Sequence, residues 1–160
     1  MTAQGNSDPE PVRHSVTVPG PPERAFVAFT EGFAGWWPRE YTWSQDVLET
    51  IAIEPKVGGR CFERGPHDFE CDWGRVLTWD PPHRVLFTWQ IGPSREPVPN
   101  PARAGEVEVR FMSEGGAGAR VELEHRGFAR HGEAGEGYRD SMASEHGWPL
   151  ILDRFAASLD

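Results

Sequence analysis

The last stretch of the chain, residues 138–159, constrains the fold most strongly, because its apolar residues recur at nearly the 3.6-residue period of an α-helix. The residues that set this period are Tyr138, Met142, Trp148, Ile151, Leu152, Phe155 and Leu159. Most of the preceding chain alternates apolar and polar residues with period two, which predicts β-strands. We therefore expect an α+β domain in which a curved antiparallel sheet wraps around one long C-terminal helix. Gly147 and Pro149 should kink that helix or split it in two.

The alternation, with Pro and Gly punctuation between segments, predicts about seven strands. They cover residues 12–18, 47–53, 60–63, 69–79, 85–91, 106–111 and 119–126. Pro22 begins a short amphipathic helix that carries Ala25, Phe26, Phe29 and Phe33. No linker or internal repeat divides the chain, so residues 12–160 should form a single domain behind a disordered N-terminus of residues 1–11.

The abundance of tryptophan bears on what lies between helix and sheet. Seven Trp among 160 residues favour large amphipathic walls over a tightly packed aliphatic core, and hence a domain that holds a ligand. Trp36, Trp37 and Trp43 lie outside the predicted strands, as residues at a cavity mouth or a core edge often do. The proline-rich segment 92–105 is too long for a tight hairpin and is either disordered or a functional lid.

Charge and motif content exclude several classes of function. The net charge is -9 and no block of Lys or Arg is present, so a nucleic-acid partner is not expected. No apolar run reaches the length of a membrane span, and the polar N-terminus does not resemble a secretion signal, which favours a cytoplasmic protein. The chain lacks HExxH, GxSxG and GxGxxG motifs, so we expect neither a metal nor a cofactor.

Two cysteines leave one alternative open. Cys61 and Cys71 are equidistant from Pro66, and in a hairpin centred there they would face each other across the strand pair. A disulfide is then geometrically available, although reduced thiols are the rule in the cytosol.

Few polar residues are candidates for chemistry. His125 shares a strand face with Val121 and Leu123 and should point inward, where it would hydrogen-bond a ligand or the backbone, or transfer protons. Arg60 and Glu63 lie on opposite faces of their strand, so at most one of them faces the interior. An acid/base set inside the cavity would have to come from His125, Glu63, Arg60 and Tyr138.

The pattern as a whole resembles the START-like superfamily, also called the SRPBCC or helix-grip fold, and within it the branch named for the activator of the heat-shock-protein-90 ATPase. The segments that carry the resemblance are PPERAFVAFTEGFAGWWP (21–38), VGGRCFE (57–63), GRVLTWDPPHRVLFTW (74–89), EVEVRF (106–111), ARVELEH (119–125) and GWPLILDRF (147–155). The resemblance implies a cavity between sheet and C-terminal helix that holds hydrophobic molecules such as lipids or polyketides. It does not fix an activity.

A narrower set of segments, VRHSVTV (12–18), EGFAGWWP (31–38), RVELEH (120–125) and GWPLIL (147–152), is similar to the self-sacrificing resistance proteins of enediyne producers. In those proteins the activated drug abstracts a backbone glycine hydrogen and the chain is cut. The similarity implies that Gly115, in the SEGGAGA loop, is a self-cleavage position. Glycine suits this chemistry because no Cβ shields its Cα.

These observations favour a protein that binds a bulky hydrophobic small molecule, aromatic or polyketide-like, in antibiotic biosynthesis or self-resistance. The predicted ligand-binding residues are Trp36, Trp37, Trp43, Arg60, Phe62, Trp89, Phe111, His125 and Trp148. Two alternatives remain open at this point: an enzyme of the polyketide cyclase or aromatase type, and a chaperone accessory that binds a protein partner.

Overall fold

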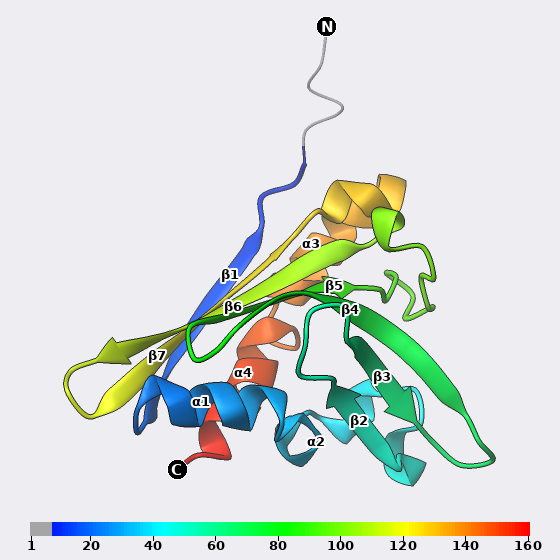
Figure 1. Cartoon of the computed structure of the whole chain (residues 1–160). Coiled ribbons are helices and arrows are strands. Elements are labelled where there is room, and N and C mark those ends of the chain that lie inside the picture. Colours follow the sequence, from blue (N-terminus) through cyan, green and yellow to red (C-terminus); the bar gives the residue numbers. More distant parts are fainter. Residues whose placement is uncertain (1–7) are drawn as a thin grey trace, which may run out of the picture.

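A computed structural model describes residues 8–160 of the chain. Seven antiparallel strands form one sheet in the order β1-β7-β6-β5-β4-β3-β2, so the two N-terminal strands occupy opposite edges (Figure 1). The strands are β1 (Val12–Pro19), β2 (Thr50–Ile53), β3 (Arg60–Arg64), β4 (Glu70–Asp80), β5 (Arg84–Trp89), β6 (Gly105–Glu114) and β7 (Gly118–Arg126). The predicted α+β helix-grip architecture is confirmed.

Two pairs of helices accompany the sheet (Figure 1). The α-helices are α1 (Pro22–Thr30), α2 (Phe33–Trp36), α3 (Gly135–Ala143) and α4 (Trp148–Ala157). Short 3-10 turns are η2 (Arg39–Tyr41), η3 (Gln45–Val47), η4 (Pro101–Arg103) and η5 (Phe128–Ala134). None of the helices in residues 8–160 has the length and apolarity needed to cross a bilayer.

The interruption predicted in the C-terminal helix is present, and it separates α3 from α4. Gly147 is the position at which a side chain would not fit, because an added Cβ would lie 2.2 Å from the carbonyl oxygen of Met142. Pro149 occupies the first turn of α4, where its missing N–H leaves no hydrogen bond unmade. The inner face of α4 then packs Ile151, Leu152 and Phe155 into the core.

The N-terminal helical stretch differs from the single helix that we predicted. It consists of α1 and the one-turn α2, which separate at Gly32, where a Cβ would lie only 2.8 Å from the Ala28 oxygen. Phe26 and Phe29 of α1 pack edge-on against Phe111 of β6, with ring centroids 5.2 and 5.9 Å away. These contacts fix α1 on the concave face of the sheet.

The predicted strand 47–53 is shorter than expected. Val47 ends η3, in which its N–H donates to Ser44 O, and the ladder with β3 begins only at Thr50. The loss of the first residues to a turn matters for the site, because it brings the 41–44 segment onto the concave face of β3.

The cysteines do not face each other. Glu63 pairs with Cys71 and Arg64 with Glu70, so the hairpin is centred on His67 and not on Pro66. A register shift between Cys61 and Phe62 then pairs Cys61 with Gly74, and the hairpin on which the disulfide depended is not formed. Both thiols are free.

The predicted disordered N-terminus lies partly outside the described residues, which begin at Asp8. Asp8 Oδ1 accepts the N–H of Ala129 at 3.0 Å, and Glu10 O accepts a hydrogen bond from Arg139 Nε at 3.0 Å. Residues 8–10 therefore contact η5 and α3 ahead of the first strand.

Candidate functional site

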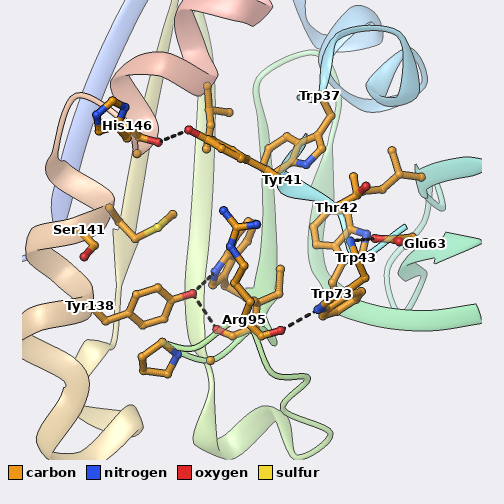
Figure 2. A pocket seen from close by; sticks show the side chains of 18 of the residues that line it. Trp37, Tyr41, Thr42, Trp43, Glu63, Trp73, Arg95, Tyr138, Ser141 and His146 are labelled. Atoms are coloured by element: carbon orange, nitrogen blue, oxygen red, sulfur yellow. Dashed lines mark hydrogen bonds between the residues drawn. The ribbon is translucent and has the colours of Figure 1, made fainter. Parts of the chain in front are cut away.

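A cavity of about 400 Å³ lies between the concave face of the sheet and the segments that cover it (Figure 2). Strands β2 to β5 supply one side, the segment 37–43 and the loop 91–95 form the mouth, and α3 with the link 144–147 closes the other side. This volume is within the range of small-molecule sites.

Six aromatic side chains dominate the cavity wall. They are Trp37, Tyr41, Trp43, Trp73, Trp89 and Tyr138. The rings of Trp37 and Trp73 are nearly parallel, at 12° with centroids 6.4 Å apart, whereas Trp89 meets both at steeper angles. Flat aromatic surfaces at several orientations suit a ligand that is itself flat and aromatic.

Tyr138 fixes the far side of the cavity. Its hydroxyl accepts the indole N–H of Trp89 and donates to the carbonyl oxygen of Ile91, both at 2.8 Å (Figure 2). These two bonds join α3 to the end of β5 and to the start of the covering loop. Both functions of the hydroxyl are thereby occupied.

Two aromatic residues hold the mouth. Trp43 Nε1 donates to Arg95 O at 2.7 Å, and the Tyr41 hydroxyl donates to His146 O at 2.8 Å (Figure 2). The Arg95 guanidinium lies 5.3 Å from the centroid of the Tyr41 ring, in a cation–π contact. One short segment therefore binds both the loop on one side of the mouth and the helix link on the other.

The polar wall is small and contains one buried carboxylate. Glu63 is 1% exposed, and its two oxygens accept the backbone N–H groups of Trp43 and Ser44 at 3.0 and 2.6 Å. The remaining polar side chains on the wall are Thr42, Arg95, Ser141, Ser144 and His146. Within residues 8–160, no three His, Cys, Asp or Glu side chains are grouped so as to hold a metal ion.

The family of the chain follows from comparison with known proteins. Residues 19–160 match the family described as activator of Hsp90 ATPase homolog 1-like protein. The chain belongs to this family. No curated protein sequence matches it significantly.

Two solved structures resemble this member of the Hsp90-activator-homolog family in sequence as well as in fold. An anthrahydroquino-gamma-pyrone synthase, Txn09, solved in complex with SUM, is 38% identical over 94% of this chain and 97% of that one, with a TM-score of 0.65. The self-sacrificing resistance protein CalC from Micromonospora echinospora is 29% identical over 94% of each chain, also at 0.65. Protein MLL2253 from Mesorhizobium loti, at 19% identity, 94% and 96% coverage and a TM-score of 0.59, shows the fold alone.

The structure brings some of the predicted residues together in the cavity of this family member. Trp37, Trp43 and Trp89 line it, as do the acid/base candidates Glu63 and Tyr138. Glu63 faces inward because it alternates with Phe62 and Arg64 along β3.

Other predicted ligand-binding residues lie elsewhere. Phe62 is on the outer face of β3, where the Arg60 guanidinium covers its ring at 4.8 Å and itself pairs with Asp72 at 2.6 Å. Trp36 and Phe111 both pack against Phe29 in the core.

His125 and Trp148 are buried beside the cavity and do not line it. His125 points inward, as its strand parity predicts, and is fully buried. Burial, together with the neighbouring His131, lowers the pKa of His125 from 6.5 to about 3, so the imidazole is neutral at physiological pH. His125 is thus a neutral, enclosed side chain outside the wall of this cavity.

Several wall residues were not predicted from the sequence. Trp73 lies on β4 at the register shift, between the partners of Phe62 and Cys61, and its indole N–H has no hydrogen-bond partner among the described residues. Tyr41 is adjacent to the aromatic run that drew attention to Trp43. Arg95 and His146 lie in the proline-rich loop and at the helix break, and both of these interruptions were visible in the sequence.

Gly115 lies in the tight turn that joins β6 to β7, with a φ of +66° and open space around its Cα. The turn is remote from the cavity. Gly105, at the other end of β6, pairs with the wall residue Trp89, and the strand to Glu114 extends about 30 Å. A ligand within the cavity therefore does not reach Gly115.

Proposed function

We propose that this protein binds a flat, multi-ring aromatic molecule of the polyketide type in the cavity beneath α3 and α4. The observation that carries the proposal is the wall of six aromatic side chains around about 400 Å³. A tricyclic or tetracyclic molecule would exchange water for ring faces over most of its surface. The similarity to Txn09 and CalC supports a polyketide setting.

Tryptophan fluorescence provides a direct test, because four of the wall residues are indoles. We expect anthraquinones, which absorb near the indole emission and stack on it, to quench the signal saturably with a micromolar Kd. Ser141→Phe places a bulky ring on the α3 side of the cavity and should weaken binding at least about tenfold. Asp140→Phe, a neighbouring exposed position outside the wall, is the matched control. Equal quenching of both variants and the wild type would place the binding outside this cavity.

A second function, ring closure of a polyketide, is favoured by one observation: the cavity contains a buried carboxylate, Glu63, that is suited to accept a proton. The name of Txn09 describes it as a synthase of a compound that contains a pyrone ring. Mass spectrometry of unsaturated polyketide phenols incubated with the protein tests this reading. Loss of any conversion in Glu63→Gln at ligand concentrations that saturate the variant is the expected result, and conversion unchanged by that substitution would eliminate this function.

The self-resistance reading is tested in the same incubations by the intact mass of the protein. Because Gly115 is about 30 Å along the strand from the cavity wall, we expect the chain to stay uncut at that position when the ligand is held in the cavity. Ligand-dependent cleavage at Gly115 would instead establish self-sacrifice and show that the drug binds outside this cavity.

A further inference from the structure

Glu63 is the one carboxylic acid among the described residues that line the cavity, and its environment is unusual. It is 1% exposed, and it lines the same cavity as Trp43 and Trp73. Its partners are two backbone N–H groups, and within residues 8–160 it forms no ion pair with a basic side chain. Burying a carboxylate without a counter-charge costs free energy, which further hydrogen bonds to the carboxylate reduce.

The Glu63 carboxylate can accept more hydrogen bonds than the protein donates to it. A carboxylate offers about four lone-pair sites, and the N–H groups of Trp43 and Ser44 occupy two of them. Thr42, the neighbouring wall hydroxyl, is already engaged, since it donates to Arg39 O and accepts the N–H of Gln45. The group still required at Glu63 is therefore a hydrogen-bond donor, and the cavity is where such a donor would come from.

We infer that Glu63 selects ligands that present a free, neutral hydroxyl, so the ligand class is a hydroxylated polycyclic aromatic whose phenolic or enolic O–H donates to this carboxylate. The inference rests on the proposed function, since it requires the aromatic body to lie in the cavity. A hydrogen bond from an O–H group to a carboxylate is shorter and about twice as strong as one between neutral groups. It can therefore distinguish ligands that have a free hydroxyl from ligands that lack one.

The charge of Glu63 also dictates which form of the ligand binds. A phenolate has no proton to donate and would bring a second negative charge against the first at short range in a poorly solvated site. Arg95, at the mouth, is separately engaged over the Tyr41 ring. The neutral phenol should therefore bind in preference to its anion.

A matched ligand pair tests the inference: β-hydroxyanthraquinone, whose hydroxyl is remote from the ring carbonyls, and its methyl ether. Fluorescence titration of the wild type should favour the hydroxyl compound by about tenfold or more, as expected for a hydrogen bond to a charged group. In E63Q the preference should fall to about twofold or less, because the amide is a weaker acceptor. Glu54→Gln is the control: Glu54 likewise accepts a backbone N–H, from Arg60 at 2.7 Å, but lies outside the cavity wall.

A second measurement needs no variant and so does not depend on how E63Q folds. The affinity of the wild type for the hydroxyl compound should fall as pH rises through the pKa of the ligand's own phenol, while affinity for the methyl ether stays level. The absorption spectrum of the bound compound should be that of the neutral phenol.

The outcomes are separable. Equal wild-type affinity for the two compounds, an unchanged preference in E63Q, or a bound phenolate spectrum would each overturn the selection by Glu63 while leaving aromatic binding intact. Failure of both compounds to bind would remove the proposed function and the inference with it.

Discussion

Trp148 donates its indole N–H to Nδ1 of His125 at 3.0 Å, and both side chains are buried between the sheet and α4. Because Nδ1 is the acceptor, the imidazole proton lies on Nε2, which has no acceptor within the described chain. The rings of Phe128 and Trp89 enclose the imidazole on its other sides. This pair joins β7 to the first residue of α4.

His125 should make the stability of the protein pH-dependent. The unfolded chain takes up a proton near pH 6.5, whereas the folded chain does so only near pH 3, so the unfolded state binds more protons between these values. The free energy of unfolding should fall as pH drops through this window, by up to about 1.4 kcal/mol per pH unit. His131, whose pKa burial also lowers, contributes in the same direction. Urea unfolding at a series of pH values measures the slope.

His125→Gln, which keeps an acceptor for Trp148, should flatten the slope between pH 6.5 and about pH 5.5, above most of the range in which carboxylates titrate. His146→Gln changes an exposed imidazole and should leave the slope as it is. An unchanged slope in His125→Gln would mean that His125 is protonated in the folded state.

Tyr138→Phe should destabilise the protein by about 1–3 kcal/mol, because it leaves the buried Trp89 N–H and the Ile91 carbonyl without partners. Tyr41→Phe removes a hydroxyl that also donates to a carbonyl, but at an exposed site, and should cost less than about 1 kcal/mol. Denaturant midpoints of the two variants measure the difference. Equal losses would contradict the distinct environments of the two hydroxyls.

Trp43→Phe should open the mouth of the cavity. The ring remains but the bond to Arg95 O is lost, so trypsin should cut after Arg95 several-fold faster, and ligands should associate and dissociate faster with little change in Kd. Trp79→Phe makes the same chemical change on β4, where the indole packs against Phe26, and is the control. Proteolysis rates that match in the two variants would show that the Trp43–Arg95 bond does not restrain the loop.

Glu108 lies on the outer face of the sheet, with a side chain 5% exposed and with Arg84, Arg110 and Arg126 around it. Burial alone would raise its pKa, but hydrogen bonds from Arg126 and Arg84 and the charge of Arg110 lower it to about 2. The stability that the ionised group contributes should be present above pH 4.5 and should fall as pH drops from there toward 2.

Glu108→Gln should cost about 1–3 kcal/mol at neutral pH and remove that part of the acid sensitivity. Glu122→Gln alters a more exposed carboxylate bonded by Arg120 and should change the free energy of unfolding by less than about 1 kcal/mol. Urea unfolding at pH 7 and pH 3 distinguishes the two. A neutral effect of Glu108→Gln would mean that its three arginines are adequately solvated without it.

The fold was largely predictable because period-two alternation and a 3.6-residue period are local signals. The break at Gly147 was equally local. The shortened β2 was not, because the turn before it is held by Glu63, a residue of the neighbouring strand. The cysteine pairing failed because the hairpin is centred on His67, one residue beyond Pro66, so that Cys71 pairs with Glu63. A register shift between Cys61 and Phe62 then pairs Cys61 with Gly74.

The sequence predicted the type of site, an aromatic cavity, but only some of the residues that line it. Trp37, Trp43 and Trp89 were recognisable as aromatic residues near a mouth or on an inward face, and the structure places all three on the wall. Phe62 faces outward because the parity of a strand tells which residues share a face and not which face is concave. Arg95 is positioned by the hydrogen bond that its carbonyl oxygen accepts from the Trp43 indole, 52 residues away in sequence.

The gap between α3 and α4 has a consequence for how relatives diversify. The roof of the cavity there is a link of a few residues, 144–147, and the two helices on either side are each held by their own contacts, through Tyr138 and through Phe155. We expect a change in the length of this link to alter the space beneath it more than the packing of either helix on the sheet. Relatives with cavities of different size should therefore differ at this joint before they differ in the hydrophobic core.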